Sequence, residues 1–117
     1  RIMFLGFRND ISYILTNSTF FIHTPILPDP FPTVVFEAIQ AKIPVITNDL
    51  GGAYEILNNG KNGLIIKNDL INESVDKILT FIENRELQKE NTEIAFDYVC
   101  KNFSLKNFEK KIIKIVG

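Results

Sequence analysis

Two carboxylates and an expected helix start stand close together in the chain. Seven residues separate Asp29 from Glu37, and two prolines lie in this stretch just before an apolar run that begins at Thr33. Prolines keep a loop extended and threonine is a good N-cap, so we expect a helix from Thr33 to Lys42. Free N–H groups at a helix start bind anions, and carboxylates accept hydrogen bonds from hydroxyl groups. These residue types predict a site for a polyhydroxylated anionic ligand, of which a nucleotide sugar is an example.

Glu37 is the polar exception in a helix that is otherwise apolar nearly all the way round, a pattern that predicts a buried helix. A buried carboxylate is costly unless a protein donor or ligand hydroxyls satisfy it. Because helix side chains lean toward the N-terminus, Glu37 should face the loop that carries Asp29. The two acids are therefore expected to open into one crevice.

The composition is typical of one globular domain. The chain has 117 residues, of which 45% are hydrophobic and 23% charged, with a formal net charge of -1. Nucleic acid is not an expected partner, because a basic excess that would neutralise phosphates is missing. The single cysteine, Cys100, excludes an internal disulfide framework and fits a reducing cytoplasm. No apolar run approaches the ~20 residues that cross a bilayer.

The elements that must position the two acids alternate between short apolar runs and helical segments. We expect strands at 2–5, 20–23, 44–47 and 64–66, and helices at 10–15, 33–42 and 53–57. Residues 58–63 form a turn rich in asparagine and glycine, which tolerate positive φ. Short strands divided by helices indicate a doubly wound α/β fold, in which helices cover both faces of a parallel sheet.

The last part of the chain is expected to be helical. Asn72 is the expected cap of one helix, residues 86–101 form a second, and Ser104 caps a third. The third helix carries an apolar stripe and a lysine cluster, which we expect to be a solvated face, with a contact to anionic lipid as the alternative: Lys106, Lys110, Lys111 and Lys114.

Three irregular loops are expected to meet at one edge of the sheet. Residues 6–9, 24–32 and 48–52 each follow an expected strand and precede an expected helix. Ligands of such sheets bind beyond the carboxyl ends of the strands. Asp10 is the expected cap of the helix after the first loop.

Several short motifs, in this order, resemble one enzyme family: Asp29 to Glu37 with Ala38, Pro44-Val45-Ile46, Gly51-Gly52 with Glu55-Ile56, Asn59-Gly60 with Asn62-Gly63-Leu64, and Phe103-Ser104. The family is the retaining GT-B glycosyltransferases of family 4, or group 1, and the resemblance is to their C-terminal, donor-binding half. It covers nearly the whole chain. It implies a Rossmann-like, doubly wound parallel sheet with a helical C-terminal part. It also implies sugar transfer from a nucleoside-diphosphate sugar to a hydroxyl of a glycan or lipid-linked acceptor.

The resemblance implies a role for each acid. Glu37 matches the glutamate that binds the ribose, and Asp29 matches the carboxylate near the reacting carbon, where a negative charge stabilises oxocarbenium character. The backbone N–H groups of Phe31, Thr33 and Val34 match donors to the sugar and the diphosphate.

Other residues correspond to the lining of the same crevice. Arg8 matches the loop around the base, although a plain surface cation is an equal alternative. Thr24 matches a small hydroxyl residue. Gly51 and Gly52 match glycines beside the cleft, although a tight strand-to-helix turn explains them as well. We expect His23 to be a packing residue at a strand end.

The chain departs from the family pattern in two ways. Asp29 replaces a commoner glutamate, which shortens its reach, and Pro32 replaces a common glycine and so removes one N–H donor. The family's N-terminal acceptor domain and the first βα unit of its C-terminal half are not in these residues. We therefore expect a single domain over 1–117 that belongs to a longer glycosyltransferase and transfers no sugar alone.

The resemblance further implies a UDP-, GDP- or ADP-sugar as donor and no metal or other cofactor. The expected location is the cytoplasm, and a peripheral contact of the longer enzyme at the inner face of the membrane stays open. A non-catalytic nucleotide-sugar-binding or scaffold module is the main alternative. A dinucleotide-dependent oxidoreductase would need Gly-x-Gly-x-x-Gly after its first strand, which residues 6–9 do not supply. A receiver domain would need an acidic cluster at its strand ends.

Overall fold

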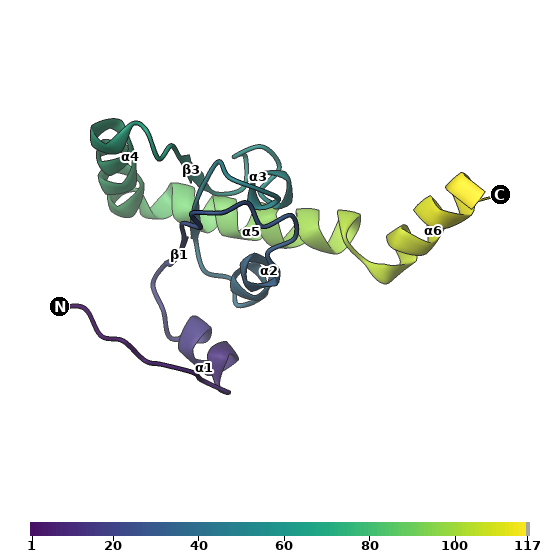
Figure 1. Ribbon diagram of the computed structural model, residues 1–117, viewed down its shortest axis with the longest axis horizontal. Helices are drawn as coiled ribbons and strands as arrows, with labels where there is room; N and C mark the ends of the chain where they lie inside the picture. The colour runs from purple at the N-terminus through teal and green to yellow at the C-terminus, as the bar shows by residue number, and fades with distance from the viewer. Residues whose placement is uncertain (117) are drawn as a thin grey trace.

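A three-stranded parallel sheet lies at the centre of the computed structural model, which describes residues 1–116 (Figure 1). The strands follow the order β1 (Phe21–His23), β2 (Val45–Asn48) and β3 (Leu64–Ile66), so β2 is paired on both sides. Every residue of β2 is buried, as expected for the central strand of a covered parallel sheet. The strands expected at 20–23, 44–47 and 64–66 are thus confirmed, with small shifts in their ends.

Helices cover both faces of the sheet, which confirms the α/β architecture. On one face, a core that includes Val45 packs against four helices: α1 (Ile11–Thr16), α2 (Thr33–Gln40), α3 (Ala53–Ile56) and α5 (Arg85–Asn102). On the other face, Ile46 and Ile66 pack against Phe81 of α4 (Ile71–Glu83). Val45 and Ile46 pack into different hydrophobic clusters, because successive residues of a strand point to opposite faces of the sheet.

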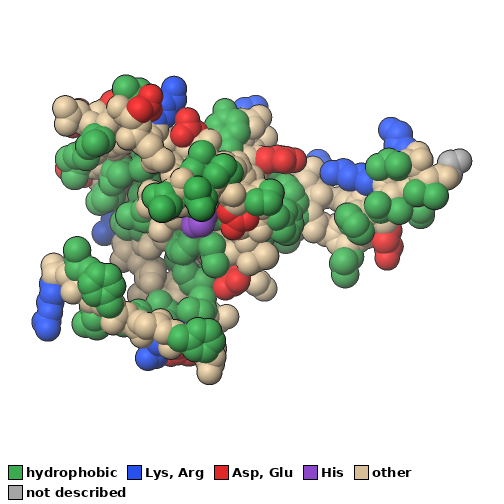
Figure 2. All heavy atoms as spheres, viewed as in Figure 1, with side chains coloured by type: hydrophobic (Ala, Val, Ile, Leu, Met, Phe, Trp, Pro, Cys, Tyr) green, Lys and Arg blue, Asp and Glu red, His purple; other side chains and the backbone are tan. Residues whose placement is uncertain are grey.

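The last helix, α6 (Leu105–Val116), extends away from the rest of the molecule (Figure 1). In Figure 2 blue side chains lie along the upper side of this helix, with apolar side chains both beside them and below, and every described residue of α6 is exposed except Asn107, which is half-buried. Ser104 caps it as expected, because the Asn107 N–H donates to Ser104 Oγ over 3.4 Å. Within residues 1–116, no helix is both long enough and apolar enough to cross a membrane.

The strand expected at residues 2–5 is wrong. These residues run outside the sheet, at a distance from β1 (Figure 1), and Phe4 is 95% exposed. A strand exists only where a neighbour takes up its N–H and C=O groups, and an apolar run alone does not provide that neighbour. The loop at 6–9 consequently enters α1 but does not leave a strand.

Two of the expected helix caps are also wrong, and a third is right in its position only. Pro32 is the N-cap of α2, so Thr33 is its first helical residue, and Asn72 lies inside α4, which begins at Ile71. Asp10 is the N-cap residue of α1, but its carboxylate binds Arg8 instead of a helix N–H. The Asp10 side chain is of a type suited to a cap, but the neighbouring Arg8 takes up its carboxylate.

Residues with positive φ stand just after the end of α2 and in the turn that follows α3. Lys42 has a φ of 55°, and its N–H donates to Ile39 O, which ends α2 before the expected residue. In the turn after α3, Asn58, Asn59 and Gly60 all have positive φ, as the composition of this turn predicted.

Candidate functional site

The loops that follow β1 and β2 meet at the carboxyl edge of the sheet. The Gly52 N–H donates to the backbone oxygen of Asp29 over 2.8 Å, which joins residues 49–52 to the 24–32 loop. The expected convergence of these two loops is therefore present. We call the 24–32 segment the rim loop.

Gly51 and Gly52 are required by the closeness of this contact. A Cβ on Gly51 would lie 2.4 Å from the backbone oxygen of Asp29, and a Cβ on Gly52 would lie 2.0 Å from that of Pro30. Gly51 also has a φ of +82°. Packing against the rim loop and the turn conformation together explain why glycine is needed here.

Asp29 lies exposed in the rim loop and shapes its own turn. The Phe31 N–H donates to Asp29 Oδ1 over 3.0 Å, an arrangement in which an aspartate binds the backbone two residues on. In this structure the N–H of Phe31, an expected donor to the ligand, thus serves the turn. Contact between that N–H and a ligand would require the bond to open.

The start of α2 follows the rim loop in the chain, and aromatic rings pack next to it. Phe31 lies 4.9 Å from Phe36, and Phe36 lies 5.2 Å from Phe103, measured between ring centroids. Thr33 and Val34 are exposed in the first turn, where backbone N–H groups have no partner within the helix. This turn therefore presents donors to the surface.

Glu37 is exposed, which corrects the expectation of a helix buried all round. α2 buries Val35, Ala38 and Ile39, while Glu37 lies on an exposed side that also includes Thr33, Val34 and Gln40. The helix is therefore one-sided, and the cost of burying a carboxylate does not apply to Glu37. Its carboxylate is accessible to a ligand.

A cavity of about 460 Å³ lies between the N-terminal segment, β1 and α2. Among its lining residues are Glu37, Val34, Arg8 and His23. The described residues that line it do not include Asp29, so the expectation of one crevice for both acids is not met in this cavity. The candidate residues form two groups, one in this cavity and one in the rim loop, and the first turn of α2 connects them.

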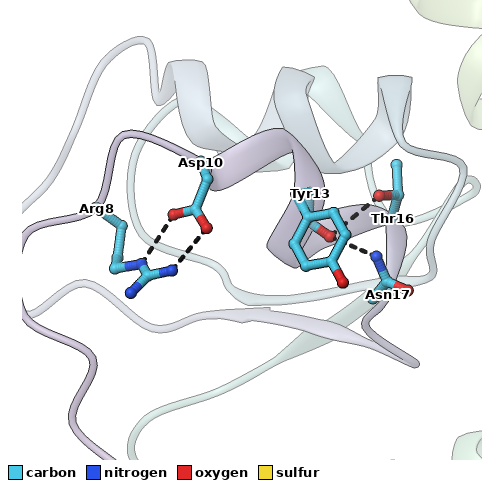
Figure 3. A network of polar contacts seen from close by, with 5 residues as sticks. All are labelled: Arg8, Asp10, Tyr13, Thr16 and Asn17. Atoms are coloured by element: carbon cyan, nitrogen blue, oxygen red, sulfur yellow. Dashed lines mark hydrogen bonds and ion pairs between the residues drawn. The ribbon is translucent and has the colours of Figure 1, made fainter.

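Arg8 is held at the cavity by Asp10 (Figure 3). Its Nε donates to Asp10 Oδ1 over 2.8 Å, and the second nitrogen of this two-point pair lies 2.6 Å from Oδ2. The hydrogen bonds from Arg8 lower the pKa of the Asp10 carboxyl from its ordinary value of 3.8. Both side chains are well exposed, so Arg8 is at once a cavity residue and a surface cation.

His23 and Thr24 lie where β1 ends. The His23 ring is stacked near Phe21, with 6.2 Å between centroids, which fits the expected packing role. Its Nε2 is buried without a hydrogen-bond partner among residues 1–116. Thr24, the next residue, is exposed in the rim loop.

Sequence reasoning missed two residues at the end of β2. Thr47 Oγ1 donates to the backbone oxygen of His23 over 2.8 Å, and Asn48 Nδ2 donates to that of Pro25 over 2.8 Å. Both side chains are fully buried. The sequence feature that could have identified them is the change from apolar to polar residues at the carboxyl end of an apolar strand, the edge of the sheet where ligands bind.

No group of three or more histidine, cysteine, aspartate or glutamate side chains is placed to hold a metal ion in the described part of the chain.

Comparison with known proteins connects this chain to one family. The family model of glycosyl transferases group 1 matches residues 1–98. An uncharacterized glycosyltransferase of Methanocaldococcus jannaschii is 32% identical over 119 residues, which covers 98% of this chain and 30% of that protein. Spore coat protein SA of Bacillus subtilis is 35% identical over 82 residues, which covers 66% of this chain and 22% of that protein.

A solved structure is similar in both fold and sequence. The crystal structure of Anabaena HepE in complex with UDP-glucose matches with a TM-score of 0.79 and 28% identity, over 96% of this chain and 31% of that one. The chain thus spans less than a third of the length of these relatives.

Proposed function

Since the chain belongs to the glycosyl transferases of group 1, we propose that it forms the donor-binding part of a retaining glycosyltransferase. The donor is a nucleoside-diphosphate sugar, and the acceptor is a hydroxyl of a glycan or lipid-linked molecule. The observation that carries the proposal is the exposed Glu37 carboxylate, one turn inside α2, in a cavity lined by the 5–8 segment. The similarity to a protein solved with UDP-glucose supports this class of ligand.

The chemistry of each group suits one part of such a donor. The Glu37 carboxylate can accept hydrogen bonds from both hydroxyls of a ribose. The N–H groups of Thr33 and Val34, together with the positive end of the helix dipole, favour the diphosphate. Thr24, Gly51 and Gly52 are proposed to border the part of the donor between these groups. Arg8 is proposed to border the base.

Asp29 is the proposed catalytic residue. As the bond between the anomeric carbon and the diphosphate oxygen breaks, positive charge develops on the sugar ring, and a fixed negative charge nearby stabilises it. The basic groups that would neutralise the departing diphosphate, and the acceptor site, are proposed to lie in other parts of a longer protein. We therefore propose that residues 1–117 bind a donor but transfer no sugar alone.

A non-catalytic nucleotide-sugar-binding module remains a second candidate, because Asp29 has a structural use in its bond with the Phe31 N–H. The two proposals agree on Glu37 and differ on Asp29.

Calorimetric titration of the chain with UDP-glucose, UDP, GDP and ADP tests the binding that both proposals require. Saturable heat with at least one nucleotide is expected. Absence of binding, in this chain and in a longer protein that contains it, would exclude both.

A further inference from the structure

The end of β2 holds the rim loop through buried hydrogen bonds. Asn48 Nδ2 donates to Pro25 O over 2.8 Å and to Asn68 Oδ1 over 3.2 Å, so one amide connects the loop after β1 with the segment after β3. Thr47 adds its bond to the backbone oxygen of His23. These contacts hold the beginning of the rim loop against the centre of the sheet.

Fold stability is a poor explanation for Asn48. Its side chain is fully buried, yet within the described residues its Oδ1 accepts no hydrogen bond. A buried acceptor without a partner destabilises a fold, and an apolar side chain of similar size would avoid that cost. What asparagine adds at this position is the pair of bonds from its amide nitrogen.

The rim loop has a second tie near its other end, where the Gly52 N–H binds Asp29 O. Glu37 is held differently, because it belongs to α2, whose buried residues Val35, Ala38 and Ile39 pack into the core. Release of the rim loop should thus move Asp29 and leave Glu37 in place.

We propose that Asn48 is a positioning residue that fixes the rim loop, and with it Asp29, at the sugar end of the donor site. This inference rests on the proposed function for its consequence, but the placement of the loop can be measured without a ligand. Asn48 itself does not contact the donor in this proposal.

The test replaces Asn48 by leucine in the 117-residue chain and has two readouts. Amide hydrogen exchange of Gly52 should accelerate by roughly 10-fold or more, because the tie to Asp29 loosens when the loop is released. The affinity for UDP-glucose should fall roughly 5- to 10-fold relative to that for UDP, since about one hydrogen bond to the sugar is misplaced while the ribose contact is kept. A merely structural defect would weaken both ligands equally.

Asn62→Leu is the matched control. Asn62 is only 2% exposed and, like Asn48, has a side-chain oxygen without a partner in residues 1–116; its side-chain nitrogen has none either, and it lies in the turn after α3. This variant should alter neither the exchange of Gly52 nor the ratio of the two affinities. If Asn48→Leu does not fold, Gly52→Ala displaces the same loop by steric contact with Pro30 and should change the ratio in the same direction.

Unchanged exchange at Gly52 in a folded Asn48→Leu protein would overturn the proposal, as would equal losses for UDP and UDP-glucose. If the wild-type chain binds neither ligand, the proposed function has failed for this chain. The exchange rates then decide alone whether Asn48 positions the loop.

Discussion

Asp29 illustrates how one side chain can have both a structural and a chemical use. Its Oδ1 closes the turn with the Phe31 N–H, while the residue as a whole is exposed. A substitution that keeps the turn and removes the charge separates the two uses.

Asp29→Asn is that substitution, because the asparagine side chain retains an oxygen for the Phe31 N–H. In a longer protein that contains this chain, we expect turnover to fall by roughly 100-fold or more, as for other losses of transition-state charge stabilisation. The affinity for UDP should stay within about 2-fold, and the free energy of unfolding within about 0.5 kcal/mol. The control is Asp49→Asn, which changes another exposed acid, in the loop that follows β2. Undiminished turnover would remove Asp29 from the catalytic role.

Glu37→Gln should weaken nucleotide binding, since glutamine keeps one oxygen acceptor but loses the charge that strengthens both hydrogen bonds to a diol. Hydrogen bonds to charged groups contribute about 1.5–3 kcal/mol, so we expect a loss of roughly 10- to 100-fold in the affinity for UDP. Isothermal titration calorimetry measures it. Glu83→Gln, at an exposed acid near the end of α4, should have no effect. Equal affinities of wild type and Glu37→Gln would remove Glu37 from the site.

The pair between Arg8 and Asp10 should be sensitive to acid. Because Arg8 lowers the pKa of Asp10 in the folded state, the pair is fully formed above the ordinary value of 3.8 and is lost as the pH falls through the lowered value. The NMR signal of Arg8 Nε–H should therefore move toward that of a free arginine as the pH falls below this range. In Asp10→Asn the signal should lack this transition. A wild-type signal that is constant through acid would show that the pair is absent in solution.

Helix ends show where cap residues act and where they only resemble caps. Asn84 Oδ1 accepts from the Leu87 N–H over 3.0 Å at the start of α5, whereas Asn72 is the second residue of α4. Both asparagines are exposed, so they form a matched pair for a stability measurement.

Asn84→Ala should lower the free energy of unfolding by about 1 kcal/mol, because it leaves a helix N–H without its acceptor. Asn72→Ala should leave it within about 0.5 kcal/mol, as for other exposed positions without such a contact. Urea denaturation of both variants makes the comparison. A larger loss for Asn72→Ala would mean that α4 begins after Asn72 in solution, two residues later than in this structure.

The whole molecule consists of a layered body and a projecting helix. None of the described residues of α6 is buried, whereas Phe103, just before it, packs against Phe36. A chain that ends after Ser104 should therefore keep its fold, with a melting temperature within about 2 °C of the full chain, since almost no packing is lost. Circular dichroism on heating measures this. A clear drop would show that α6 packs against the body in solution.

The free edge of β1 bears on the extent of the domain. Among residues 1–116, β1 pairs only with β2, and Ile22 is 54% exposed beside the cavity that Glu37 lines. Edge strands with exposed apolar residues readily accept another strand. We propose that in a longer protein a βα unit preceding residue 1 continues the sheet at this edge. Extending the chain upstream along a natural longer sequence should then raise its melting temperature.

Much of the fold followed from local patterns. The three apolar runs that became strands, the turn at 58–63 and the Ser104 cap at the start of α6 depend on interactions within a few residues. The candidate site was partly accessible in the same way, because Glu37 and Asp29 belong to one short motif. The strand expected at 2–5 was wrong because pairing depends on a neighbour that the local pattern does not specify.

What the order of residues established was the kind of elements, the family motif and the two acids, since helix periodicity, turn chemistry and motif spacing act along the chain. The tertiary structure decided which side of α2 is exposed to water, that Arg8 pairs with Asp10, and why residues 51 and 52 are glycines. The bond from Asn48 to Pro25 joins residues 23 positions apart. Such contacts depend on how separate segments pack, and packing is a property of surfaces that exist only after the segments have come together.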